Sequence, residues 1–297
     1  MWNATLEPYR LRLEQSLEFL PDKPEETAAS TAAALWLLAA GVPVSPQRAL
    51  HLELPSLHPQ QQEHLENLMT RRLSGVPLAH LTQRQQFMGI EMLAGPQALV
   101  PRKETELLAT AAIDLVRRCI DAQGRCSFVD VCTGSGNVAL AVAHHVRQAH
   151  VHAADLSDEA VALARRNAEH LQLAGVVTFA TGDLLAPFDE ERFIGSVDVL
   201  TCNPPYINST KVERMPREIA DYEPRLAFDG GALGISILMR LIKEAPRFLC
   251  QGGWLLFEVG AGQGPALMKR IKASSDYAHV ESVSDESGTV RVVMAQH

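Results

Sequence analysis

The sequence predicts an α/β protein built around a doubly wound parallel sheet, with a smaller all-α domain in front of it. Three observations lead to this fold class. From residue 104 onward, segments with helical spacing of apolar residues alternate with short apolar runs typical of buried strands. Residues 1–80 show helical patterns separated by turns that contain proline. The chain of 297 residues is also too long for one small core, which favours a large and a small domain.

The front of the chain is expected to form an N-terminal helical domain over residues 1–80. Ser45 followed by Pro46 is a favourable helix start, because serine can cap the first turn and proline needs no hydrogen-bonded N–H there. In residues 81–100 the short apolar runs are broken by Gly89 and Gly95, which is typical of a β-hairpin linker. The helices expected in the front domain span residues 11–20, 27–40, 45–52 and 59–73.

Residues 101–297 are expected to form one catalytic domain in which helices and strands alternate. Such alternation makes a parallel sheet covered by helices on both faces. Residues 280–295 have the pattern of two strands joined by a turn, which would add a C-terminal antiparallel hairpin. The other expected helices span residues 104–119, 137–146, 158–171 and 235–249, and the other expected strands span 127–131, 150–154, 176–180, 196–202 and 253–259.

Composition limits the function classes. The formal net charge of −8 argues against a nucleic-acid partner, because contacts with phosphates need clustered Lys and Arg. The most apolar stretch, residues 32–44, is too short to span a bilayer, and the chain start lacks the pattern of a secretory signal. We therefore expect a cytoplasmic protein with no membrane partner. We also expect a monomer, although the sequence features above do not determine the oligomeric state. Five cysteines without CxxC spacing fit reduced thiols in that compartment: Cys119, Cys126, Cys132, Cys202 and Cys250.

The first strand of the alternating region leads into a glycine-containing turn and a helix start, in the stretch FVDVCTGSGNVALA at residues 128–141. Gly134 and Gly136 let the backbone approach a ligand where a Cβ would be in the way. Asp155 ends the next strand, 19 residues after Gly136, where an acid can accept both hydroxyls of a ribose. Taken alone, this pattern also fits a dinucleotide such as NAD, because Ala139 completes a loose Gly-x-Gly-x-x-Ala motif.

Two further features favour S-adenosyl-L-methionine, with S-adenosyl-L-homocysteine as its product, over NAD. Asp130 lies inside the first strand, four residues before Gly134, which gives the spacing D-x-x-x-G-x-G. Asp183 and Leu184 follow the third strand, where an acid can contact an adenine amino group and an apolar side chain can cover the ring. These features predict a Rossmann-like domain that binds S-adenosyl-L-methionine.

After the fourth strand the chain passes through Asn203, Pro204, Pro205 and Tyr206, the NPPY segment. Neither proline can donate a ladder hydrogen bond, so the strand must end at Asn203 and the next carbonyls are held in one direction. Placed after such a first half, the NPPY segment resembles that of amino-methyltransferases that modify a planar NH₂ nitrogen. DNA adenine, ribosomal-RNA guanine or adenine, and protein glutamine all present such a nitrogen.

This resemblance implies catalysis by positioning and electrostatics more than by a strong base. The Asn203 side-chain oxygen and the Pro204 carbonyl can accept the two N–H hydrogens, which directs the nitrogen lone pair at the sulfonium methyl. Tyr206 can pack on the planar group and favour the positive charge that develops on nitrogen.

From about residue 70 to the end, the chain resembles the release-factor glutamine methyltransferase family. The similar segments are GVPLAHLTQRQQFMG (75–89), LVPRKETELL (99–108), EIADYEPRLAFDGGALGISILMRLI (218–242) and LLFEVGAGQG (255–264). The resemblance implies the fold of a class I S-adenosylmethionine-dependent methyltransferase with a substrate-recognising front domain. The implied partner is a peptide-chain release factor, methylated at N5 of the glutamine in its Gly-Gly-Gln tripeptide.

The resemblance also implies roles for single residues. The NPPY residues would bind the substrate and carry the catalysis, Arg102 and Glu104 would close the rim of the pocket, and Glu223 would brace the loop after NPPY. The residues expected to bind the cofactor are Asp130, Thr133, Gly134, Ser135, Gly136, Asp155, Leu156, Asp183, Leu184 and Asn203.

Three residues depart from the family pattern. Cys132 stands where glycine is usual, Leu184 replaces the frequent aromatic residue over adenine, and Lys103 replaces a proline. These changes suggest a diverged member, which leaves a small-molecule amide or amine, or an amino group of ribosomal RNA or DNA, as alternative acceptors. A non-catalytic module that keeps the cofactor fold is a third alternative, which the intact NPPY segment does not favour.

Four histidines could suggest a metal site. They lack a cysteine or carboxylate at ligand spacing, and a zinc ion would leave the transfer chemistry unexplained. We therefore expect no metal at His144, His145, His150 and His152.

Overall fold

The computed structural model describes residues 4–212, 215–231 and 234–297. The chain divides into two compact units. The first contains the residues up to Pro96 together with Val100–Lys103 and Pro216–Glu223, and the second contains Gln97–Leu99, Glu104–Met215 and Pro224–His297. A short segment from the second half of the sequence is therefore part of the first unit.

The first unit is mainly helical, as the sequence predicts. Its core forms around α2 (Ala28–Ala39), which is buried along most of its length and begins with a capping box between Thr27 and Ser30. The other elements are η1 (Ala4–Leu6), α1 (Glu7–Ser16), α3 (Pro46–Ala49), α4 (Pro59–Leu73), α5 (Leu78–Thr82), β1 (Arg84–Phe87), β2 (Ile90–Leu93) and α10 (Arg217–Ala220).

Helix α1 differs from the prediction of a helix over residues 11–20. It starts earlier, because Pro8 occupies the first turn, where no hydrogen-bonded N–H is needed. It also ends earlier, since Leu17 is already extended with φ −116° and ψ 137°. The expected apolar continuation to residue 20 therefore forms a connection and not a helical turn.

Strands β1 and β2 form an antiparallel hairpin in which Phe87 lies opposite Ile90. The two residues between them, Met88 and Gly89, have φ of 50° and 80°. Positive φ at both positions gives a turn whose twist matches that of the strands. Gly89 meets this requirement without strain, whereas Met88 adopts a conformation that is uncommon outside glycine.

Buried ion pairs hold the segment Pro216–Glu223 in the first unit. Glu218 accepts hydrogen bonds from Lys23 Nζ at 2.9 Å and from Arg72 Nη1 at 2.8 Å. Burial raises the pKa of Glu218, but the two cations outweigh it, so the pKa lies below its ordinary value. Glu223 accepts from Arg102 Nη2 at 2.6 Å and from the backbone N–H of Val100 at 3.0 Å. Removing one partner of such a pair would leave a buried charge uncompensated.

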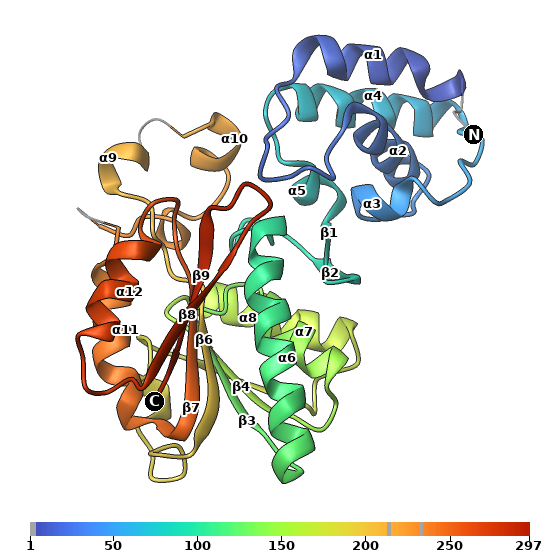
Figure 1. Cartoon of the computed structure of the whole chain (residues 1–297). Coiled ribbons are helices and arrows are strands. Elements are labelled where there is room, and N and C mark those ends of the chain that lie inside the picture. The colour runs from blue at the N-terminus through green and yellow to red at the C-terminus, as the bar shows by residue number, and fades with distance from the viewer. Residues whose placement is uncertain (1–3, 213–214, 232–233) are drawn as a thin grey trace. The chain divides into compact units, whose positions relative to one another are not determined.

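The second unit contains a seven-stranded sheet in the order β5-β4-β3-β6-β7-β9-β8 (Figure 1). The first five strands in this order are parallel, and β9 pairs antiparallel with both β7 and β8. The doubly wound sheet with a C-terminal antiparallel hairpin is confirmed. The strands are β3 (Ser127–Val131), β4 (His150–Asp155), β5 (Val177–Thr181), β6 (Val197–Cys202), β7 (Leu249–Glu258), β8 (His279–Ser284) and β9 (Val290–Gln296).

Helices cover both faces of this sheet. In Figure 1, α6 and α7 lie on one side of the strands and α11 and α12 on the other. The predicted helix over residues 235–249 is shorter in the structure, because Pro246 turns its last part into the 3-10 turn η5 (Ala245–Arg247). The helical elements of this unit are η2 (Lys103–Thr105), α6 (Glu106–Gln123), α7 (Asn137–His145), α8 (Asp158–His170), η3 (Ala186–Phe188), α9 (Ser209–Val212), η4 (Arg225–Ala227), α11 (Ser236–Glu244), η5 and α12 (Gly264–Lys272).

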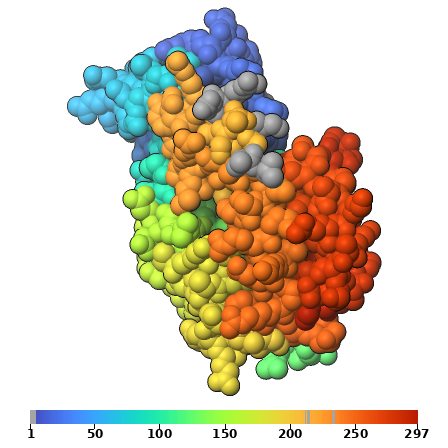
Figure 2. Space-filling model, turned by 90° about the vertical axis from the view of Figure 1, so that its left-hand side faces the viewer, coloured from blue at the N-terminus to red at the C-terminus, as the bar shows by residue number. Residues whose placement is uncertain are grey.

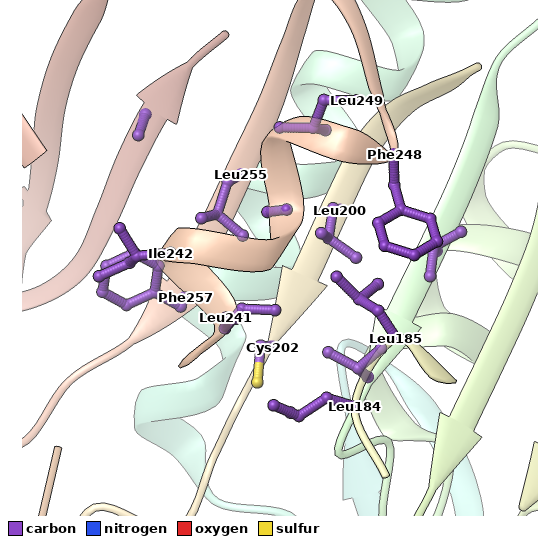
Figure 3. Packing of buried hydrophobic residues seen from close by; sticks show 14 of the residues in the cluster. Leu184, Leu185, Leu200, Cys202, Leu241, Ile242, Phe248, Leu249, Leu255 and Phe257 are labelled. Atoms are coloured by element: carbon purple, nitrogen blue, oxygen red, sulfur yellow. The ribbon is translucent and has the colours of Figure 1, made fainter. Parts of the chain in front are cut away.

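The core on the α11 side of the sheet fixes the two central strands. Figure 3 shows Leu200 and Cys202 of β6 beside Leu255 of β7, with Leu241 of α11 packed over them. All four side chains are buried. No helix in the described ranges is long and apolar enough to cross a membrane.

Substitution of Leu200 tests this core. Leu200→Ala should lower the free energy of unfolding by about 2–5 kcal/mol, because it leaves a cavity between closely packed elements. Urea unfolding followed by circular dichroism measures the loss. Ile194→Ala, at a partly exposed position of the same unit, should change the free energy by less than about 1 kcal/mol. Equal losses in both variants would contradict the packing described here.

Candidate active site

The parallel sheet brings the predicted site segments to one edge. Val131 at the end of β3 pairs with Ala154 of β4 on one side and with Cys202 of β6 on the other. The glycine turn after β3 therefore lies between Asp155 and the NPPY segment, although these are far apart in the sequence. Asp155 in turn pairs with Thr181 at the end of β5, just before the predicted adenine contacts. Carboxyl ends of parallel strands are where α/β folds bind their ligands.

The glycine turn is built by backbone constraints. Gly134 and Gly136 have φ of 55° and 82°, in the left-handed region that favours glycine. A Cβ on Gly136 would lie 3.0 Å from Leu140 Cδ1 and 3.1 Å from Ala164 Cβ, so this position also needs glycine for close packing. Gly136 caps the start of α7 and leaves the first N–H groups of that helix at the edge of the sheet.

Asp155 links the glycine turn to the next loop. Its Oδ2 accepts the N–H of Gly134 at 2.8 Å, and its Oδ1 accepts the N–H of Ser157 at 2.9 Å. Burial raises the pKa of Asp155 above its ordinary value, although these backbone hydrogen bonds lower it. The sequence predicted Asp155 as a ribose ligand, and the structure adds a second role in shaping the turn.

Asp130 is a buried carboxyl at the centre of the sheet. It accepts hydrogen bonds from Thr133 Oγ1 at 2.6 Å and Thr201 Oγ1 at 2.7 Å. Burial raises its pKa to about 6, even though both hydroxyl bonds lower it. Thr201 precedes the NPPY segment by two residues, so Asp130 ties β3 to β6 close to the turn. Sequence reasoning did not single out Thr201.

Cys132 occupies a strained position. Its φ of 56° lies in the region that costs most residues about 1–2 kcal/mol. This geometry explains why glycine suits the position. Burial and the neighbouring Cys132 thiol raise the pKa of the Cys202 thiol well above its ordinary value, so Cys202 stays protonated and is no nucleophile.

The residues after β5 divide between core and surface. Leu184, with φ 49°, is buried in the cluster that contains Cys202 (Figure 3). Asp183 is exposed and forms a bidentate pair with Arg240 Nη1 at 3.3 Å and Nη2 at 2.9 Å. On the surface in Figure 2, the yellow residues around this loop lie beside orange residues of the α11 region. Leu156 is 54 % exposed. Arg240 was not foreseen from the sequence.

Asn203 is partly exposed at the end of β6 and is not turned into the core. Its Nδ2 donates a hydrogen bond to Thr105 Oγ1 at 3.1 Å. Fixing the amide through its nitrogen presents Oδ1 as the acceptor. Pro204 is buried, and the following loop is held by the hydrogen bond from Ile207 N to Phe228 O at 3.0 Å.

Tyr206 is anchored through its hydroxyl and its backbone. The hydroxyl donates to Glu104 Oε1 at 2.9 Å and lies 3.2 Å from Glu258 Oε1, and Glu104 is also paired with Arg291. Gln263 Nε2 donates to the carbonyl of Tyr206 at 3.1 Å. Glu258 and Gln263 belong to the segment LLFEVGAGQG, which gave a family resemblance but no role. They are supporting residues that sequence reasoning missed.

The two residues predicted to close the pocket rim fall in different units. Glu104 holds Tyr206 in the second unit. Arg102 is 6 % exposed within the first unit, where it contacts Glu223 and, through Nε at 3.1 Å, Asp22 Oδ2. Their closing role stays a prediction, as does the role of Glu223 in bracing the loop after NPPY.

The four histidines that could have suggested a metal site are not gathered in one cluster. His144 and His145 stack edge to face at the end of α7, and His152 contacts Thr178 and Phe193. Within the described ranges, none of them belongs to a group of three or more metal-ligand side chains.

The sheet order, the glycine turn and the NPPY corner define the class: a class I S-adenosylmethionine-dependent methyltransferase. A family model described as "Methyltransferase small domain" matches residues 111–235. The catalytic domain of human METTL16, solved with a hairpin of the MAT2A 3′UTR, superposes with a TM-score of 0.55 at 13% identity, over 77% of this chain and 81% of that chain. The N-terminal domain of human METTL16 in complex with SAH gives 0.50 at 16% identity, over 77% and 82%. These likenesses show the fold alone.

Sequence relatives show the family. A protein of Moorella thermoacetica named release factor glutamine methyltransferase is 36% identical over 225 residues, which cover 76% of both chains. A protein of Geobacter sulfurreducens with the same name is 32% identical over 259 residues, or 87% of this chain and 86% of that one. The chain belongs to the release factor glutamine methyltransferase family, which confirms the resemblance seen in the sequence.

The residues at this edge fit the cofactor of that family, S-adenosyl-L-methionine. The turn offers backbone N–H groups without a Cβ in the way, and the partly exposed Asp155 carboxylate can accept hydroxyl donors. Ser135 Oγ is buried and has no hydrogen-bond partner among the described residues. An unpartnered hydroxyl inside a built turn is a group for a ligand to satisfy.

The raised pKa of Asp130 predicts a pH dependence of cofactor binding. A cationic cofactor favours the ionised carboxyl, so binding should lower this pKa and affinity should fall as the pH drops through about 6. Between pH 7 and pH 5 we expect about a tenfold loss, measured by isothermal titration calorimetry with S-adenosyl-L-methionine. Asp130→Asn should remove the dependence and Asp189→Asn, an exposed site, should keep it. If cofactor affinity still depended on pH in Asp130→Asn, another titrating group would be responsible.

Proposed function

We propose that this chain transfers the methyl group of S-adenosyl-L-methionine to N5 of the glutamine in the Gly-Gly-Gln tripeptide of peptide-chain release factors. The observation that carries the proposal is the NPPY corner beside the glycine turn, with the Asn203 amide fixed by Thr105. The names of the relatives support the same acceptor. In this proposal the enzyme works as a monomer in the cytoplasm, where release factors act on the ribosome.

The cofactor binds at the edge of the sheet formed by the carboxyl ends of β3, β4 and β5. The Asp155 carboxylate accepts the ribose hydroxyls, and the turn from Thr133 to Gly136 cradles the amino-acid end. The bound cofactor supplies an electrophilic methyl group on a sulfonium. In this proposal Leu184 and Asp183 contact the adenine, and Arg240 orients the Asp183 carboxylate.

Activation of the acceptor falls to the NPPY segment. The lone pair of an amide nitrogen is delocalised, so the nitrogen attacks poorly unless its hydrogens are held. Asn203 Oδ1 and the Pro204 carbonyl each accept a hydrogen bond from one amide N–H. The two bonds direct the nitrogen lone pair at the methyl group of the sulfonium. Both acceptors also favour the positive charge that develops on nitrogen, and the methylated nitrogen then releases one proton to water to give the neutral N-methyl amide. Preorganisation is supplied by Thr105 for Asn203 and by the buried Pro204 ring.

Tyr206 completes the site from the acceptor's other side. Its ring can lie against the planar amide while the hydroxyl stays fixed by Glu104 and Glu258. Gly260 leaves room for this ring, since a Cβ there would lie 3.0 Å from Tyr206 Cδ2. Tyr206 is therefore held in one orientation against the acceptor.

Labelled cofactor decides the acceptor. The enzyme should label a bacterial release factor, and replacing the tripeptide glutamine by alanine should abolish the label. RNA, DNA and small amides serve as competing acceptors in the same assay. Equal labelling of the release factor and of its glutamine-to-alanine variant would refute the proposed acceptor. Transfer of the label to nucleic acid without transfer to protein would also refute it.

Asn203→Ala should reduce turnover by about 100-fold or more, because one orienting acceptor in a preorganised site is worth a few kcal/mol. Cofactor affinity should change by less than about threefold. Asn208→Ala, in the same loop, is the matched control and should keep most of the activity. Lost cofactor affinity with unchanged turnover would contradict the role given to Asn203.

Asp155→Ala should show the opposite pattern. It removes the predicted ribose acceptor and the partner of the Gly134 N–H, so the dissociation constant for S-adenosyl-L-homocysteine should rise by about tenfold or more. Turnover at saturating cofactor should fall less than affinity does. A variant that binds the cofactor normally would show that Asp155 only shapes the turn.

A further inference from the structure

At the edge of the sheet opposite to the NPPY segment, three thiols and a carboxylate converge from α6, β6, β7 and the residue before β3. Cys119 lies in the last part of α6 and Cys126 directly before β3. Asp198 is the second residue of β6, and Cys250 is the second residue of β7. Three of the five cysteines of the chain therefore meet at one place.

The donor atoms are close enough to share one ion. The Sγ atoms of Cys119 and Cys126 and a carboxylate oxygen of Asp198 all lie within 4.8 Å of one another. Cys250 Sγ is 3.5 Å from Asp198 Oδ1. In a tetrahedral zinc site, two thiolates are about 3.8 Å apart and a thiolate and a carboxylate oxygen about 3.6 Å apart. Cys119, Cys126 and Asp198 are therefore near these separations, and the contact of Cys250 with Asp198 makes it the candidate fourth donor.

The carboxylate is already oriented by its neighbours. Asp198 Oδ2 accepts the backbone N–H of Ser127 at 2.7 Å, which fixes the group and leaves Oδ1 on the side of the thiols. The Gln123 amide donates to Cys119 Sγ at 2.8 Å and to Asp198 Oδ1 at 3.0 Å. The Ser127 N–H thus orients the carboxylate through the oxygen that does not face the thiols, as outer hydrogen bonds do in built metal sites.

We propose that Cys119, Cys126, Asp198 and Cys250 form a structural Zn²⁺ site. Soft thiolates select Zn²⁺ over Mg²⁺ or Ca²⁺, and four protein donors leave no open position for a reacting ligand. The ion would clamp the end of α6 to the starts of β3, β6 and β7. It would take no part in methyl transfer, because the full length of β3 separates it from the glycine turn.

The sequence predicted no metal, because its clustered histidines lack a cysteine or carboxylate at ligand spacing and its cysteines show no CxxC spacing. The donors come from segments up to 131 positions apart, counted from Cys119 to Cys250, and only the parallel pairing of β6 with β3 and β7 brings them together. The inference is independent of the methyl acceptor.

Metal titration of the full-length, reduced and chelator-treated protein tests the site. Co²⁺ should bind at one ion per chain with the charge-transfer absorption of thiolate ligands, and Zn²⁺ should displace it. At Zn²⁺ concentrations about 100-fold above the dissociation constant, the melting temperature should rise by roughly 5–10 °C. Absence of a thiolate band, or an unchanged melting temperature, would overturn the proposal.

Matched cysteine variants assign the ligands. Cys119→Ser and Cys250→Ser should weaken Co²⁺ binding by at least about tenfold, while their circular dichroism stays that of the parent. Cys132→Gly removes a thiol far from the cluster, at a position whose φ suits glycine, and should bind Co²⁺ as the parent does. Binding that is lost equally in all three variants, or kept in all three, would overturn the assignment. So would a Cys119–Cys126 disulfide in the freshly purified protein that blocks metal uptake.

Discussion

The parallel pairing of β3 with β6 is the constraint on which the rest of the site depends. It sets Val131 opposite Cys202, so the glycine turn and the NPPY segment leave the sheet side by side. Asp130 reinforces this register from within, because it accepts hydroxyl bonds from its own turn and from Thr201 on the neighbouring strand. A shift of one residue would separate the methyl donor and acceptor positions and would take Thr201 away from the buried Asp130 carboxyl.

Rigid support surrounds each group that has a chemical role. Asn203 is held by Thr105. Tyr206 is held by Glu104, by Glu258 at the end of β7, and by Gln263. Such support fits a reaction in which positioning replaces a strong base, since an amide nitrogen gains little from a base until its lone pair is aimed. Glycines 234 and 260 lie against Tyr206, where a Cβ would collide with its backbone or ring. Glycine at these two positions therefore has a steric reason.

Backbone conformation and packing explain two of the departures from the family pattern. Cys132 keeps the left-handed φ of the turn and bears the strain that glycine would avoid. Leu184 adopts the same region and packs into the core. The turn geometry is thus retained while two side chains change, which is consistent with family membership and with altered contacts to the cofactor.

By itself, the sequence determined the local features: alternating strands and helices, the glycine turn, and a strand that must end at a pair of prolines. These follow from short-range sterics and periodicity, so the fold class and the cofactor edge were predictable, whereas the family was predicted only from the resemblance of four segments. It misplaced α1 by several residues, because an apolar run does not reveal where tertiary packing ends a helix. Only the tertiary structure decided which distant side chains meet, such as Glu258 with Tyr206 or Cys250 with Asp198. Strand order and register create those contacts, and neither is written in any single segment.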